Sequence, residues 1–334
     1  LATTGSYYFL SRPRRFGKSL LISTLEAYFD GRKELFKGLA IEKLEKHWMK
    51  YPILHIDLNT EKYNTPESLE RILNFTLLNW EKLYGSGPGE TSLALRFRGI
   101  VERAARQAGQ GVVILIDEYD KPMLQAIGNE DLQSAYRSTL KSFYSVLKTM
   151  DKYIHFAFLT GVTKLGKVSV FSDLNNLQDI SMAERYVEVC GMSEKEIHQY
   201  LEPQLHELAA ANKQSYEETC LRLKQNYDGY HFAPDTAGVY NPFSLLHAFK
   251  NREFGSYWFA TGTPSYLVEL LKRHHYDLDR LAHEETGAET LDGVDSVDSD
   301  PIPVIYQSGY LMIKGYDARF GTYRLGFPNL EVEE

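Results

Sequence analysis

Gly17, Lys18 and Ser19 stand between an apolar run, Tyr7–Leu10, and a segment with helical spacing, Ser19–Phe29. In that setting, backbone N–H groups at the start of a helix point at phosphate oxygens. A lysine in this position reaches the β- and γ-phosphates, and a serine hydroxyl takes a place on Mg²⁺. The segment therefore predicts a phosphate-binding loop (P-loop), in which the glycine lets the backbone approach the phosphates closely.

The loop departs from the usual Gly-x-x-x-x-Gly-Lys-Ser/Thr pattern, because Arg12 stands where the first glycine is expected. The alternative interpretation is that Gly-Lys-Ser only begins a helix and binds nothing. Under the P-loop interpretation, Lys18 also serves catalysis. The residues expected to contact the nucleotide are Arg12, Pro13, Arg14, Arg15, Phe16, Gly17, Lys18, Ser19 and Leu20.

A second motif, Val112–Glu118, is an apolar run that ends in two acids. This is the form of a Walker B strand, whose aspartate holds Mg²⁺. We expect Asp117 to serve the metal together with Ser19, and Glu118 to act as the base that takes a proton from the attacking water. An apolar strand with an ordinary solvated end would look the same. The two motifs together favour nucleoside-triphosphate chemistry.

Two threonines lie at the end of a later apolar run, on either side of Gly161. A polar residue at the tip of a strand beside the Walker B strand can contact the γ-phosphate or the attacking water, so Thr160 and Thr163 are candidate catalytic residues. The alternative is a strand end that turns on the glycine, with both hydroxyls bonded locally.

Three arginines are candidates for a finger that stabilises charge on the transferred phosphoryl group. Arg14 and Arg15 lie in the P-loop, and Arg185 lies near the start of a predicted last strand, Tyr186–Cys190. A solvated basic loop, or one that grips an acidic partner surface, would use the first two equally well. Arg185 also fits an ordinary surface position.

Strand-like and helix-like segments alternate along the first part of the sequence. This alternation predicts an α/β fold with a mainly parallel sheet and helices on both faces. Four apolar runs predict buried strands: Tyr7–Leu10, Ile53–Leu58, Val112–Ile116 and Ile154–Leu159. The segments between them have helical spacing: Ser19–Phe29, Pro66–Tyr84, Ser92–Ala108 and Asp131–Met150.

The alternation of strands and helices gives way to helical segments after residue 190. We therefore expect an ATPase-like core over residues 1–190 and a second domain over residues 191–334. Helices are expected first in the second domain, over Ser193–Ala211 and Tyr216–Tyr227. The breaker-rich segment Glu284–Asp300 predicts a loop. Two strands, Leu311–Tyr316 and Tyr323–Phe327, predict a hairpin like the wing of a winged helix.

The composition is that of a globular protein: 334 residues, 43% hydrophobic, and a net charge of −8. The acidic balance argues against a nucleic-acid coat. Cys190 and Cys220 have no metal-ligand spacing and exclude a disulfide framework, which indicates a reducing cytoplasm. The start of the chain lacks a secretory pattern, and no apolar run approaches the length of a membrane span, so no membrane partner is expected.

The chain resembles the AAA-ATPase-like proteins that carry a C-terminal PD-(D/E)-x-K nuclease domain. The resemblance extends over almost the whole sequence. The motifs that carry it are Tyr8–Ser19, Ile116–Pro122, Leu159–Lys164, Tyr227–Tyr230, Tyr240–Ser244, Trp258–Pro264 and Tyr306–Leu311.

This resemblance implies an additional-strand P-loop ATPase core followed by a helical and winged-helix-like domain. It makes Arg12 an expected residue of the loop and lends Lys18, Ser19, Asp117 and Glu118 their roles. The nuclease region of relatives would begin near Gly326–Val332, so the resemblance implies that this chain does not include it. Since no lysine has an acid two positions before it, we expect no nuclease activity from these residues.

Two functions are compatible with these motifs. In the first, Mg-dependent binding and hydrolysis of ATP drives a conformational change that controls an appended nuclease or acts on nucleic acid. In the second, the protein is a non-catalytic switch, similar to signal-transduction ATPases, in which bound ATP or ADP holds a conformation. Candidate partners are ATP and ADP, nucleic acid through other parts of the full-length protein, and further copies of the chain.

Overall fold

The computed structural model describes residues 1–2, 6–165, 176–261, 264–276, 284–287, 290–291 and 300–334. It divides into two compact units. The first comprises Leu1–Leu10, Ser19–Gly161 and Leu165–Gln178, and the second comprises Ser11–Lys18, Val162–Lys164 and Asp179–Glu334. The predicted boundary between residues 190 and 191 lies inside the second unit, which also takes in the P-loop.

A five-stranded sheet with the order β2-β3-β4-β1-β5 forms the centre of the first unit. Its strands follow the apolar runs of the sequence: β1 Tyr7–Ser11, β2 Ile53–Asp57, β3 Val112–Asp117, β4 Ile154–Gly161 and β5 Gln178–Asp179. The β2–β3 and β3–β4 pairs are parallel. The prediction of an α/β fold with a parallel sheet is therefore confirmed.

Strand β4 lies between β1 and β3 in this order. The strand that precedes the P-loop and the strand that ends in the acid pair are thus separated by one additional strand. Every residue of β3 is buried, because helices cover both faces of the sheet.

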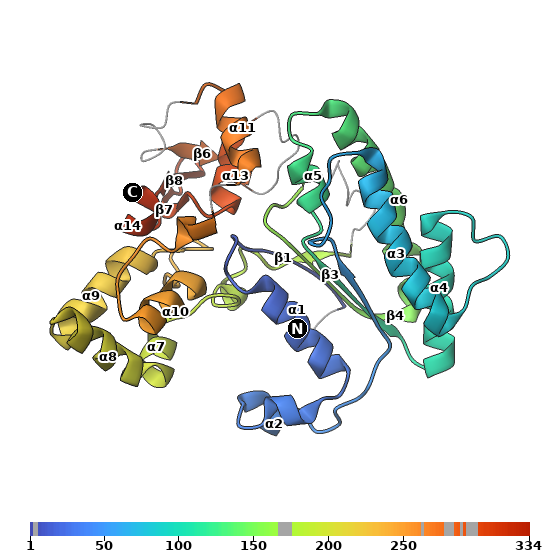
Figure 1. Ribbon diagram of the computed structural model, residues 1–334, viewed down its shortest axis with the longest axis horizontal. Coiled ribbons are helices and arrows are strands. Elements are labelled where there is room, and N and C mark those ends of the chain that lie inside the picture. Colours follow the sequence, from blue (N-terminus) through green and yellow to red (C-terminus); the bar gives the residue numbers. More distant parts are fainter. Residues whose placement is uncertain (3–5, 166–175, 262–263, 277–283, 288–289, 292–299) are drawn as a thin grey trace. The chain divides into compact units, whose positions relative to one another are not determined.

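Helices of the first unit lie on both sides of the sheet (Figure 1), with α3, α4 and α6 together on one side and α1 on the other. Side-chain caps fix two of their starts: Ser92 accepts from Leu95 N, and Asn129 accepts from Leu132 N. The helical segments of this unit are α1 Lys18–Phe29, η1 Lys33–Phe36, α2 Ala40–Leu44, α3 Pro66–Tyr84, α4 Leu93–Ala108, α5 Lys121–Gln125, α6 Glu130–Thr149 and η2 Asp151–Tyr153.

The second unit combines short helices with a three-stranded antiparallel sheet of order β6-β8-β7. The predicted hairpin is present as β7 Met312–Asp317 and β8 Thr322–Gly326. The remaining elements are η3 Glu184–Tyr186, α7 Glu194–Tyr200, α8 Glu202–Asn212, α9 Tyr216–Tyr227, α10 Pro242–Asn251, η4 Trp258–Thr261, α11 Ser265–Arg273, β6 Glu285–Gly287, α13 Pro301–Gln307 and α14 Leu330–Glu333.

The prediction of a last strand over Tyr186–Cys190 was wrong. Tyr186 is the last residue of the 3₁₀ helix η3, Val187–Cys190 follow as a series of turns, and the fifth strand is the two-residue β5 instead. The carbonyl oxygens of Tyr186 and Val189 accept hydrogen bonds from the side chain of Arg12. A strand would have used such groups to pair with its neighbour.

Two further predictions for this unit need correction. The single helix expected over Ser193–Ala211 is two helices, α7 and α8, because Pro203 has no backbone N–H and its ring clashes with a preceding carbonyl. The loop expected over Glu284–Asp300 contains β6, which pairs with β8. Residues 288–289 and 292–299 of that segment lie outside the described residues.

The chain end packs into the second unit through buried polar groups. Asn329 Nδ2 donates to the carbonyl oxygen of Asp228 at 2.7 Å. Glu331 Oε1 accepts from the backbone N–H groups of Tyr257 and Trp258, at 2.6 and 2.8 Å. These contacts bring together motifs that lie far apart in the sequence.

The close approach of residues 228–229 to residues 328–329 depends on Gly229, whose φ is +92°. A Cβ at this position would lie 2.1 Å from the carbonyl oxygen of Pro328. Only glycine combines this backbone conformation with the space that the carbonyl occupies.

Among the described residues, none of the helices has both the length and the apolar character that crossing a bilayer requires.

Candidate functional site

The P-loop turns through two residues with positive φ, Arg15 at +70° and Gly17 at +84°. Arg12 is not among the positive-φ residues. An arginine therefore replaces the first glycine of the pattern without backbone strain.

Lys18 is the first residue of α1, and its side chain bends back over the loop. Its ammonium donates to the carbonyl oxygens of Arg12, at 3.1 Å, and Pro13, at 3.3 Å. The residue is only 4% exposed. The loop thus holds the lysine side chain in one orientation.

The guanidinium of Arg12 is buried in the second unit, with the residue 1% exposed. It donates to the carbonyl oxygens of Ser181, Tyr186 and Val189 at 2.7, 2.8 and 3.0 Å, and to that of Ser11 at 2.9 Å. Its carbon lies 4.0 Å from the centroid of the Phe232 ring. Burial lowers the pKa of Arg12 to about 10. The side chain anchors the loop and does not extend toward solvent.

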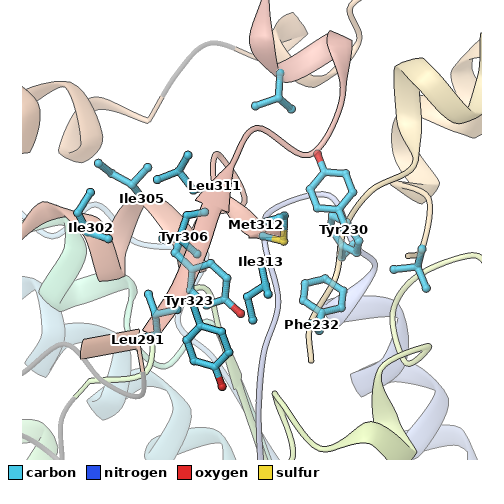
Figure 2. Close-up of a cluster of buried hydrophobic side chains, with 14 of the residues drawn as sticks. Tyr230, Phe232, Leu291, Ile302, Ile305, Tyr306, Leu311, Met312, Ile313 and Tyr323 are labelled. Atoms are coloured by element: carbon cyan, nitrogen blue, oxygen red, sulfur yellow. The ribbon is translucent and has the colours of Figure 1, made fainter. Parts of the chain in front are cut away.

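Phe16 belongs to the hydrophobic core of the second unit, part of which is drawn in Figure 2. Its ring meets those of Tyr230 and Phe232 edge-on, with centroid distances of 4.7 and 5.6 Å. Aromatic pairs prefer this geometry. Pro13 packs closely against Gly309, where a Cβ would lie 2.6 Å from the proline side chain. The loop is therefore built into this core.

The other loop residues are more accessible. Arg14 and Arg15 are half-buried, and the Arg15 guanidinium lies 4.2 Å from the centroid of the Phe243 ring. Burial lowers the pKa of Arg15, and the like charge of Arg14 lowers it further. Ser19 is exposed, and Leu20 is 71% exposed on α1.

Asp117 is the last residue of β3 and is buried, unlike a solvated strand end. Its Oδ1 accepts a 2.7 Å hydrogen bond from the hydroxyl of Thr160 on β4, within the first unit. The backbone continues the pairing, because Tyr119 N donates to Thr160 O at 3.0 Å. Thr160 therefore contacts the predicted metal ligand through a bond that is not local in sequence.

Glu118 has a φ of +54°, which is rare for a residue with a side chain. The residue is half-buried and follows β3 directly. Such backbone conformations cost about 1–3 kcal/mol and occur often at functional sites.

Gly161 closes the end of β4 next to this turn. A Cβ there would lie 2.5 Å from Oδ1 of Asp120 and 2.7 Å from the ring of Tyr119. Both of these residues are fully buried. Glycine is therefore required for the packing of the motif that follows Glu118.

The two remaining candidate residues, Thr163 and Arg185, lie in the second unit. Thr163 is buried, and the neighbouring Val162 carbonyl accepts a 2.6 Å hydrogen bond from the Ser11 hydroxyl. Arg185 lies in η3, with its guanidinium 5.7 Å from the Tyr186 ring centroid, and not at a strand as predicted.

The residues fit a nucleotide with Mg²⁺. Magnesium in such sites takes one or two protein oxygens together with phosphates and water. Asp117 and Ser19 are the residues expected to supply that sparse set. A Cβ on Gly17 would meet no described atom within 4 Å, so space for a phosphate adjoins the loop backbone.

Sequence reasoning missed two features. It did not find that Arg12 donates to carbonyl groups about 170 residues away, because backbone acceptors leave no signal in residue types. It also did not pair Thr160 with Asp117, although the two adjacent strand ends both carried a polar residue.

Comparisons with known proteins agree with these motifs. The family model described as "Predicted AAA-ATPase" (AAA-ATPase_like) matches residues 1–171. A protein of Azotobacter chroococcum mcd 1, described as "Uncharacterized protein in vnfD 5'region", is 36% identical over 337 aligned residues. The alignment covers 100% of this chain but only 63% of the relative, so the chain spans less than two thirds of the relative's length.

Proposed function

This chain belongs to the AAA-ATPase-like family, and on that premise we propose that it binds Mg-ATP and hydrolyses it to drive a conformational change. The observation that carries the proposal is the strand order. One additional strand separates β1, which leads into the P-loop, from β3, which ends in Asp117 and is followed by Glu118. The carboxyl ends of parallel strands meet at one edge of a sheet, where nucleotides bind in folds of this kind.

Nucleotide binding falls to residues 12–20 in this proposal. Backbone N–H groups at the start of α1 face the phosphates, and the ammonium of Lys18 neutralises charge on the β- and γ-phosphates. Its hydrogen bonds to two loop carbonyls support this role, since they hold the lysine side chain against the loop.

Bound Mg²⁺ would supply positive charge that stabilises the phosphates as negative charge shifts during transfer. Ser19 and Asp117 would hold it, and the Thr160 hydroxyl fixes the orientation of the Asp117 carboxylate. Glu118 accepts the proton of the attacking water. Thr163 is proposed as a second polar group for the γ-phosphate or the water.

The P-loop also belongs to the second unit, which supports a coupling between nucleotide state and that unit. We propose a core over residues 1–190 and a helical, winged-helix-like domain over residues 191–334 as the functional division. Since the chain spans 63% of its relative, control of a nuclease and action on nucleic acid are proposals about a longer protein.

The second candidate function is a nucleotide-controlled switch without turnover. The burial of Arg12 and Phe16 in the second unit favours it, because such contacts transmit binding whether or not ATP is hydrolysed. Ligand binding shifts a conformational equilibrium only by its differential affinity for the two states.

The test is phosphate release by the purified chain at saturating ATP and Mg²⁺, beside the Glu118→Gln variant. Turnover by the parent that is lost in the variant supports the enzyme. Nucleotide binding with equal, background phosphate release in both would support the switch.

Three further proposals concern the surroundings of the site. An arginine among Arg14, Arg15 and Arg185 acts as a finger, across a contact between copies of the chain if it forms a homo-oligomer. The cytoplasm is the proposed compartment, because neither Cys190 nor Cys220 forms a disulfide. These residues are proposed to cleave no DNA by themselves.

A further inference from the structure

The guanidinium of Arg12 donates four hydrogen bonds, all of them to backbone carbonyl oxygens. Its guanidinium bridges the start of the P-loop to three carbonyl groups between residues 181 and 189, all within the second unit. Burying a charged group is costly unless it is fully hydrogen-bonded. A side chain that only filled space here would not need a charge or a planar fork of donors.

The same residue contributes the oxygen that holds Lys18. The carbonyl of Arg12 accepts from the lysine ammonium at 3.1 Å, and the carbonyl of Pro13 accepts at 3.3 Å. The guanidinium and these two carbonyls are joined by a few covalent bonds. A shift of the guanidinium would therefore move the oxygens that orient the lysine.

A second contact holds the loop at the same point. The backbone N–H of Ser11 donates to the hydroxyl oxygen of Ser181 at 2.8 Å, and Arg12 donates to the carbonyl of Ser181 at 2.7 Å. Ser181 thus binds the loop through both its side chain and its backbone. Residues 181–189 act as a fixed support for the loop.

We propose that Arg12 is a positioning residue for nucleotide binding: by fixing the loop to residues 181–189, it holds Lys18 in the orientation that receives the phosphates. This inference rests on the proposed function. In the usual pattern a glycine stands at this position, and the loop shape comes from backbone freedom. Here the shape comes from a buried side chain.

The experiment measures the dissociation constant for Mg-ATP by isothermal titration calorimetry, with far-UV circular dichroism and the nucleotide-free melting temperature as structural readouts. The variants are Arg12→Lys, which keeps the charge but loses the fork, and Ser181→Ala, which removes one acceptor. The matched control is Arg222→Ala, since Arg222 also lies over a phenylalanine ring, that of Phe254 at 4.2 Å, but outside the loop.

Arg12→Lys is expected to weaken Mg-ATP binding about ten- to hundredfold, as the loss of charge-assisted hydrogen bonds predicts. Ser181→Ala removes one ordinary hydrogen bond, so about two- to tenfold weakening is expected. Both variants should keep the parent circular dichroism spectrum, and Arg222→Ala should bind as the parent does. If Arg12→Lys does not fold, the uncharged Arg12→Gln variant decides and is expected to weaken binding at least as much, because Ser181→Ala leaves the bonds of the guanidinium in place.

Parent-like affinity in the folded variants, while Lys18→Ala loses binding, would overturn this inference and leave the proposed function standing. Equal weakening in Arg222→Ala would also overturn it, because the effect would then be general destabilisation. A parent chain that binds no Mg-ATP would overturn both proposals.

Discussion

The hydroxyl of Thr160 donates a 2.7 Å hydrogen bond to Oδ1 of Asp117, across two adjacent parallel strands of one sheet. Both residues are buried, so the bond is shielded from competing water. A carboxylate that is held in this way presents its oxygens in one orientation. The pair therefore gives the metal ligand of the proposed site a fixed geometry before any ligand arrives.

Replacing this threonine tests that relationship. Thr160→Val keeps the side-chain shape and removes the donor, so the Mg²⁺ concentration for half-maximal ATP turnover is expected to rise about tenfold, the cost of a hydrogen bond to a charged group. A magnesium titration of phosphate release measures it. Thr76→Val is the control, because the Thr76 hydroxyl bonds only to a carbonyl of its own helix. Identical magnesium dependence in both variants would refute the role.

Lys18→Ala should weaken Mg-ATP binding about ten- to hundredfold, since it removes a cation from the β- and γ-phosphates. Equilibrium titration with a fluorescent ATP analogue measures the change. Lys224→Ala is the matched control, because that lysine forms a surface ion pair with Glu194. Unchanged affinity in Lys18→Ala would remove the P-loop assignment.

Glu118→Gln should retain Mg-ATP and lose about 10²–10⁴-fold in turnover, the contribution typical of a general base. The amide has the same shape and leaves the backbone at φ +54° undisturbed, but it cannot accept the proton. Single-turnover phosphate release separates this loss from binding. Glu130→Gln, at the start of α6, serves as the control. Full turnover in Glu118→Gln would assign the base to another group.

Gly229→Ala is expected to destabilise the second unit well beyond about 1–2 kcal/mol, the cost of a left-handed backbone for a residue with a Cβ. The added methyl would also collide with the Pro328 carbonyl oxygen. Gly321→Ala provides a measure of the backbone cost alone, because Gly321 has φ +66° and no described atom within 4 Å of an added Cβ. Chemical denaturation compares the two. Equal losses of unfolding free energy in the two variants would mean that residues 328–329 move away from the added methyl group without cost.

The stability of the protein should also depend on pH through Glu331. Burial raises the pKa of Glu331, although the Trp258 N–H opposes the shift. Between the usual glutamate pKa and the raised value, the folded protein keeps a proton that the unfolded chain has released. The resulting stabilisation is complete below the usual pKa and is lost as the pH rises through this window.

Glu331→Gln removes this dependence and keeps an acceptor for the two backbone N–H groups. The melting temperature of the variant minus that of the parent should therefore increase between about pH 4 and about pH 8. Glu333→Gln, on the exposed side of the same helix, should show no such trend. A constant difference across the range for Glu331→Gln would contradict the assignment.

The elements of the first unit could be predicted because apolar periodicity carries that information. Pro66–Tyr84 forms a helix with the predicted bounds, and the four predicted strands are present. The failure at Tyr186–Cys190 has the opposite cause. Its residue types suit a strand, but its carbonyl groups accept hydrogen bonds from the distant Arg12. The residue types of a short segment do not indicate such a partner.

For the candidate site, too, the sequence indicated some residues and contacts and did not indicate others. Lys18, Asp117 and Glu118 were identifiable as candidates, whose roles stay predictions, because the chemistry expected of them needs particular residue types next to particular elements. The structural role of Arg12 was not, since a buried arginine and a solvated one look alike in a sequence. The partner of Thr160 required the order of the strands, which the sequence motifs alone did not supply.

The membership of Ser11–Lys18 in the second unit has a consequence for how the protein folds. A fragment that ends at residue 178 would keep the runs that form β1 to β4 but lose the carbonyl groups that Arg12 binds. Its loop would regain freedom worth about 1–2 kcal/mol per residue. The loop would then be ordered only when the second unit is folded, and a nucleotide that binds only the ordered loop would stabilise that unit by mass action.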